Sequence, residues 1–215
     1  MTFNHQTIFD SKENSTKTNF LSRILGVFSE SIVDFWLANE KCPYRSLGRP
    51  SLYSNDNKKL ATLDFIFQSK TDNKNYLVEQ KCFFGFKNGR LSTMSTDEIF
   101  IKEFEKWSSA KANSTPAWKY FSNFSEEAYE VKVKSEKIVI AGTMLLWASC
   151  EKEGAVKFQE KLGINKIIGI DSIINNLKEW EDSNYLNFID TRKNWIIDLL
   201  DNLNVKIKTA YNIGG

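Results

Sequence analysis

Three charged residues stand in otherwise apolar segments of this sequence. Asp64 lies within LATLDFIF (60–67), and Glu79 and Lys81 close the segment YLVEQK (76–81). A carboxylate or an ammonium group is costly to bury in a strand unless it is paired, binds a metal or takes part in chemistry. Residues two apart in a strand point to the same side. Glu79 and Lys81 are therefore expected to project together.

The segment QSKTDNK (68–74) between these two strands has the composition of a hairpin turn. A hairpin would bring Asp64 beside Glu79, with two carboxylates and one ammonium group around one point. Two adjacent carboxylates repel, and a divalent cation relieves that repulsion. Because only oxygen ligands are on offer, the pattern favours Mg²⁺. Lys81 would hold or deprotonate the attacking water and offset the charge of a phosphate.

The spacing of Asp64, fourteen residues and then Glu79-Gln80-Lys81 resembles the D-x(n)-(D/E)-x-K signature of the PD-(D/E)xK nuclease superfamily. That superfamily includes type II restriction endonucleases and Holliday-junction resolvases. The sequence has five acid-x-Lys triplets, but only Glu79 follows apolar residues and has an Asp-bearing strand in hairpin register. The resemblance implies that Asp64 and Glu79 are metal ligands and that Lys81 is the catalytic lysine.

A second part of the resemblance lies in GVFSESIVDFWL (26–37), where Gly26, Glu30 and Leu37 are similar to a G-x-x-x-E…L pattern of the superfamily's first helix. It implies that Glu30 is an auxiliary carboxylate of the site. The resemblance spans about residues 20–110.

Two alternatives need no catalysis. Lys81 could form a buried structural ion pair with Asp64 or Glu79. Glu30 could be an ordinary solvated helix glutamate, because on an ideal helical wheel it falls nearly opposite the centre of the apolar face.

Cations in the loops on either side of the two strands could contact DNA phosphates. The alternative is ordinary surface charge. These candidate DNA-binding residues are Arg45, Arg49, Lys58, Lys59, Lys87 and Arg90.

Composition limits the function classes. The chain has 215 residues, 41% of them hydrophobic, and a net charge of +2, which excludes a histone-like basic surface. His5 is the only histidine, so histidine-based catalysis and a Cys/His zinc site are disfavoured. Three widely spaced cysteines indicate reduced thiols in a cytoplasm. The sequence predicts no membrane span and no secretion signal.

Hydrophobic periodicity predicts a single α/β domain (1–215) in which helices flank a central mixed β-sheet. The resemblance implies that this fold is restriction-endonuclease-like. The sheet would draw on the hairpin, on a buried strand at 135–142 with 143–149 as its continuation or as a second strand, and on a short strand at 165–170. We expect a helix after the Ser95/Glu98 capping box and another, capped by Asp171 or Ser172, that runs to Trp180. The remaining predicted elements are helices at 18–40 and 191–203 and a terminal strand at 205–208.

Together these patterns predict a Mg²⁺-dependent DNA endonuclease, with a type II restriction enzyme as the specific form. We expect double-stranded DNA and a second copy of the chain as partners, and no membrane or organic cofactor. The catalytic core would occupy about 20–110, and the remainder would complete the sheet, read DNA and form dimer contacts. The alternatives are a structure-selective resolvase or repair nuclease, and a non-catalytic nucleic-acid-binding protein.

Overall fold

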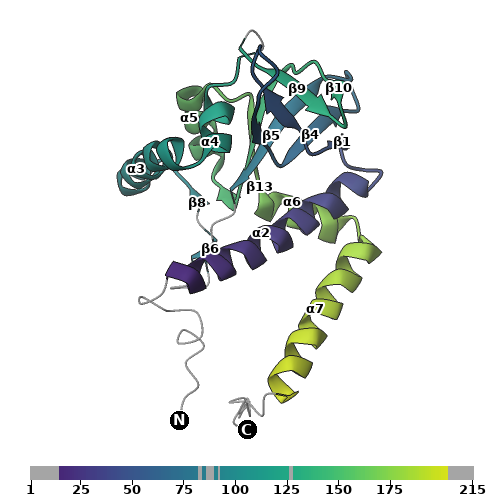
Figure 1. Cartoon of the computed structure of the whole chain (residues 1–215). Helices are drawn as coiled ribbons and strands as arrows, with labels where there is room; N and C mark the ends of the chain where they lie inside the picture. Colours follow the sequence, from purple (N-terminus) through teal and green to yellow (C-terminus); the bar gives the residue numbers. More distant parts are fainter. Residues whose placement is uncertain (1–14, 82–83, 86–89, 92, 126–127, 203–215) are drawn as a thin grey trace.

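A computed structural model describes residues 15–81, 84–85, 90–91, 93–125 and 128–202 (Figure 1). Among them, no helix combines the length and the apolar composition that crossing a bilayer requires. The helices of this part of the chain are α2 (Ser15–Ala38), α3 (Glu98–Ser114), α4 (Pro116–Ser122), α5 (Lys152–Leu162), α6 (Ile170–Glu179) and α7 (Ser183–Asn202).

The central sheet has five strands in the order β1-β4-β5-β11-β13. β1 pairs with β4 and β4 with β5 in antiparallel fashion, whereas β5 pairs with β11 and β11 with β13 in parallel. The sheet is therefore mixed, as the sequence predicts. Its strands are β1 (Tyr44–Gly48), β4 (Phe65–Ser69), β5 (Asn75–Lys81), β11 (Gly142–Trp147) and β13 (Lys166–Gly169).

Shorter strands form separate ladders beside this sheet. A four-stranded sheet has the order β10-β9-β2-β3, and two further pairs are β12-β8 and β6-β7. Their bounds are β2 (Ser51–Tyr53), β3 (Lys59–Thr62), β6 (Phe84–Gly85), β7 (Arg90–Leu91), β8 (Thr93–Met94), β9 (Glu130–Val133), β10 (Glu136–Lys137) and β12 (Ser149–Cys150).

Helices cover both faces of the central sheet, which divides the core into two clusters (Figure 1). Consecutive residues of β5 serve opposite clusters: Leu77 packs on the side of α3, α4 and α5, and Val78 on the side of α2 and α6. This alternation follows from the strand's two-residue period. The α/β class with a central mixed sheet between helices is confirmed.

The predicted strand 60–67 is instead two strands in different sheets. β3 ends at Thr62 and joins the small sheet, and β4 begins at Phe65 in the central sheet. Leu63 is fully buried, and its backbone N–H donates to the carbonyl of Pro50 at 3.1 Å rather than to a neighbouring strand. Asp64 therefore lies at the break, immediately before β4.

The predicted buried strand 135–142 is also wrong in position. Lys134 and Ser135 adopt positive φ (48° and 73°), which turns the chain from β9 into the short exposed strand β10. Val139 beyond it is 72% exposed. The buried strand is β11, which starts at Gly142 after the Ala141 N–H donates to the carbonyl of Asn75.

Helix starts differ from the predicted caps. The N-cap of α3 is Asp97, whose carboxylate accepts hydrogen bonds from the N–H groups of Ile99 and Phe100, so Ser95 is not the cap. α6 begins after Gly169 without a side-chain cap. The predicted terminal strand 205–208 lies outside the described residues.

Candidate active site

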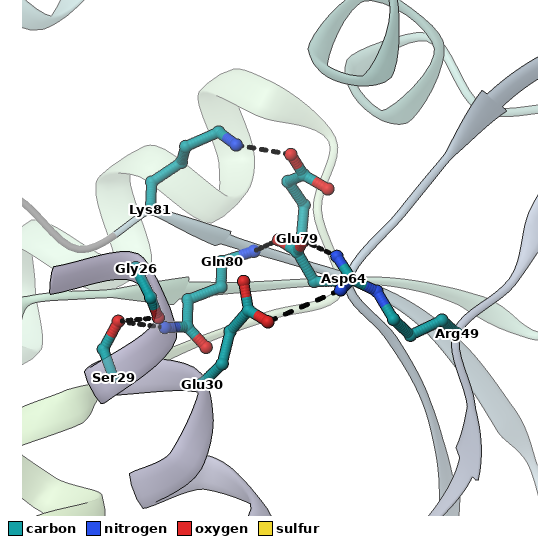
Figure 2. Close-up of polar contacts among 8 residues, drawn as sticks. All are labelled: Gly26, Ser29, Glu30, Arg49, Asp64, Glu79, Gln80 and Lys81. Atoms are coloured by element: carbon teal, nitrogen blue, oxygen red, sulfur yellow. Dashed lines mark hydrogen bonds and ion pairs between the residues drawn. The ribbon is translucent and has the colours of Figure 1, made fainter. Parts of the chain in front are cut away.

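The β4–β5 hairpin places Asp64 against the strand that carries Glu79. Phe65 pairs with Val78, so Asp64, one residue before β4, is level with Glu79. The backbone N–H of Gln80 donates to Asp64 Oδ2 at 2.8 Å (Figure 2). The predicted hairpin is confirmed, and it fixes the Asp64 carboxylate beside the acid-x-Lys triplet.

Glu79 and Lys81 lie on the same side of β5, and Lys81 Nζ donates to Glu79 Oε1 (Figure 2). The Glu79 side chain is only 3% exposed, whereas that of Lys81 is 17% exposed. The second Glu79 oxygen, Oε2, is buried and has no hydrogen-bond partner among the described residues. A buried carboxylate oxygen of this kind is costly unless another group binds it.

Burial raises the pKa of Glu79 from 4.5 to about 7; the positive charge of Lys81 lowers it, and the negative charge of Asp64 raises it further. Glu79 therefore keeps its proton to a higher pH than an ordinary glutamate does. The Asp64 contribution shows that the two carboxylates influence one another, which is the repulsion expected from their spacing.

Glu30 projects from α2 toward the same cluster (Figure 2). Its side chain is 33% exposed, and Glu30 Oε2 lies 3.6 Å from Nη1 of Arg49. Partial burial raises the pKa of Glu30, and so does the charge of Asp64, while Arg49 lowers it. Glu30 is therefore not an isolated solvated glutamate, although it lies at the edge of the site.

Arg49 joins the two sides of the cluster. Its Nη2 lies 3.4 Å from Asp64 Oδ1, while its Nη1 faces Glu30. The side chain is 59% exposed, so the guanidinium approaches the carboxylates from solvent. The sequence gives no reason to expect this bridge, because Arg49 is far from Glu30 and Asp64 along the chain and lies in a connection without regular periodicity.

A polar contact within the sheet–helix interface was not predicted. Gln80 points away from Glu79 and Lys81, and its Nε2 donates to Ser29 Oγ at 2.6 Å (Figure 2). Both side chains are buried, and Ser29 Oγ also donates to the carbonyl of Gly26. The signal in the sequence is weak: Ser29 precedes the apolar Ile32 and Val33 by three and four residues, which is the spacing of one helix face.

The described candidate DNA-binding residues other than Arg49, namely Arg45, Lys58 and Lys59, do not contact the carboxylates. Arg45 on β1 donates to Gln68 Oε1 at 2.6 Å, and Lys58 and Lys59 are exposed at the β2–β3 turn. Lys87 and the side chain of Arg90 lie outside the described part of the chain.

The oxygen ligands fit Mg²⁺ better than a metal that needs a full protein cage. Across the described ranges, no group of three or more His, Cys, Asp or Glu side chains is arranged to hold a metal ion. Mg²⁺ needs only one or two carboxylates and keeps several waters. Asp64 Oδ1 and the unpartnered Glu79 Oε2 are the atoms that would hold it.

The chain matches no protein-family model, no curated protein and no solved structure. Its function must therefore be argued from the geometry of the site.

Proposed function

We propose that this protein is a Mg²⁺-dependent endonuclease that hydrolyses phosphodiester bonds in DNA. The observation that supports the proposal is the meeting of Asp64, Glu79 and Lys81 at one point of the β4–β5 hairpin, with a buried Glu79 oxygen that no described protein group satisfies. In a buried ion pair with a purely structural role, the remaining polar atoms normally form hydrogen bonds within the protein. A buried pair that leaves a carboxylate oxygen without a hydrogen bond is more typical of a site that binds a ligand.

The protein groups have separable roles in this proposal. Asp64 and Glu79 would hold the cation. Bound Mg²⁺ would stabilise the negative charge that builds up on the phosphate during hydrolysis. Lys81 would orient the attacking water by donating a hydrogen bond to it, or offset the negative charge of the phosphate. Its ammonium group lies beside Glu79 and is partly exposed, so a substrate could reach it from solvent.

We further propose that the enzyme is a type II restriction endonuclease that acts in the cytoplasm as a homodimer on double-stranded DNA. Two identical sites related by a two-fold axis are the simplest way to cut both strands of a palindrome. A net charge of +2 is more consistent with an enzyme that recognises the edges of bases than with one that binds DNA without sequence preference.

The test is incubation of the purified protein with plasmid DNA and Mg²⁺, alongside Asp64→Asn and Glu79→Gln. Lys74→Gln is the control, because Lys74 forms an exposed pair with Asp72 in the hairpin turn, away from the site. Discrete fragments from wild type and Lys74→Gln, and none from the other two, support a restriction enzyme. Cutting of branched DNA alone indicates a resolvase. DNA binding without cleavage indicates a non-catalytic protein and overturns the proposal.

A further inference from the structure

Arg49 occupies an unusual place for an exposed cation. It follows Gly48, which adopts a positive φ of 104°, and precedes Pro50 in the connection between β1 and β2. These neighbours restrict the backbone, while the side chain itself is mostly exposed. The restricted backbone therefore holds the Arg49 guanidinium beside the carboxylates while the side chain stays exposed.

The contacts of Arg49 involve the atom of Asp64 that a cation would need. Asp64 Oδ2 is already committed to the backbone N–H of Gln80 at 2.8 Å, so Oδ1 is the oxygen that faces outward. Arg49 Nη2 covers Oδ1 (Figure 2). A guanidinium and a divalent cation repel one another and would compete for this oxygen.

These contacts are loose. The distances of 3.4 Å to Asp64 and 3.6 Å to Glu30 are longer than the roughly 2.9 Å typical of a good N–H···O hydrogen bond. An exposed ion pair of this kind is weak, so the guanidinium readily leaves these carboxylates for a stronger partner. The planar fork of arginine also matches a phosphate, which it can hold through two parallel hydrogen bonds.

We propose that Arg49 is an exchangeable counter-ion of the site: it neutralises Asp64 and Glu30 until a divalent cation displaces it, and its freed guanidinium then binds a phosphate of the DNA. This inference rests on the proposed function, because it assumes that the carboxylates hold a cation. It gives Arg49 a second role beyond phosphate binding. Since competition is reciprocal, whatever removes Arg49 from Asp64 strengthens cation binding.

The test measures Mg²⁺ binding without DNA by isothermal titration calorimetry at physiological ionic strength, where exposed distant charges are largely screened. The proteins are wild type, Arg49→Gln, Asp64→Asn and the control Lys74→Gln. Lys74→Gln also removes one positive charge, here from the exposed ion pair that Lys74 forms with Asp72 at the turn of the β4–β5 hairpin. Melting temperatures confirm that each variant is folded.

Arg49→Gln is expected to lower the Mg²⁺ dissociation constant about fivefold or more, whereas Lys74→Gln leaves it unchanged and Asp64→Asn abolishes binding. Arg49→Lys, which keeps the charge but lacks the fork that spans two carboxylates, should fall between wild type and Arg49→Gln. Equal Mg²⁺ affinity in wild type and Arg49→Gln overturns the counter-ion role but leaves the metal site intact. Absence of Mg²⁺ binding in every protein overturns the proposed function and this inference with it.

Discussion

The backbone of β5 fixes the Asp64 carboxylate, because Asp64 Oδ2 accepts a hydrogen bond from the N–H of Gln80 at 2.8 Å. Gln80 separates Glu79 from Lys81 in the sequence, so this hydrogen bond attaches Asp64 to the backbone of the Glu79-Gln80-Lys81 triplet itself. A bond to the backbone depends on strand register and not on the rotamer of another side chain. The relative positions of the two carboxylates are therefore set by the pairing of β4 with β5.

Asp64→Asn should abolish cleavage while leaving the fold intact. The asparagine oxygen can still accept the Gln80 N–H, but the neutral amide is a poor ligand for Mg²⁺. We expect cleavage to fall by at least about 100-fold, with DNA affinity in the absence of metal equal to or higher than wild type because carboxylate–phosphate repulsion is relieved. Plasmid digestion, a binding assay and a melting curve check this, and retained cleavage would contradict it.

Glu79→Gln should change how stability depends on pH. The folded-state pKa of about 7 lies above the ordinary 4.5, so the native state holds a proton between these pH values that the unfolded chain releases. The free energy of unfolding therefore falls as pH rises through this window. The fall from this one group is on the order of 3 kcal/mol, and it should be missing in Glu79→Gln. Urea unfolding of both proteins at pH 5 and pH 8 measures it; parallel profiles would count against the raised pKa.

Lys81→Gln should abolish cleavage and also destabilise the protein above neutral pH. It leaves the Glu79 carboxylate buried without the ammonium group that neutralises it. Breaking one side of such a pair costs about 3 kcal/mol. The double variant Glu79→Gln/Lys81→Gln should recover most of the lost stability, because no buried charge remains, yet stay inactive. Recovery of cleavage by the double variant would show that these groups are structural.

Ser29→Ala should destabilise the junction between α2 and β5. It leaves the buried Gln80 amide without its acceptor, which costs about 1–3 kcal/mol. Ser31→Ala is the matched control, because Ser31 lies two residues further along α2 and, within the described ranges, its hydroxyl donates to its own helix, at the carbonyl of Val27. Urea unfolding should place Ser31→Ala within about 0.5 kcal/mol of wild type. Equal effects of the two changes would argue against the interface hydrogen bond.

The hairpin and the three residues it brings together could be predicted because their signal is local. Asp64, Glu79 and Lys81 are charges in apolar surroundings, and the period of a strand decides which of them share a side. The break before Asp64 could not be predicted, since it depends on the hydrogen bond from the Leu63 N–H to the carbonyl of Pro50, in the connection between β1 and β2.

The remaining members of the cluster are brought in by tertiary contacts. On a helical wheel Glu30 falls opposite the centre of the apolar face, but the wheel does not show that Arg49 lies beside that helix. Likewise, 135–142 is as hydrophobic as a buried strand, and only the left-handed turn at Lys134 and Ser135 moves the pairing on to β11. Both outcomes depend on residues distant in sequence or on a backbone conformation that composition does not specify.

β5 is the third of five strands in the central sheet, paired on one side with β4 and on the other with β11. β11 pairs with β5 along residues 76–81, and β4 pairs with it along residues 75–78, so separating β5 from its neighbours requires the sheet itself to come apart. Glu79 and Lys81 stand on this strand and not on a loop that could open independently. Heat inactivation of this protein should therefore coincide with the loss of its whole fold, with no range of temperature in which the folded chain has lost the site.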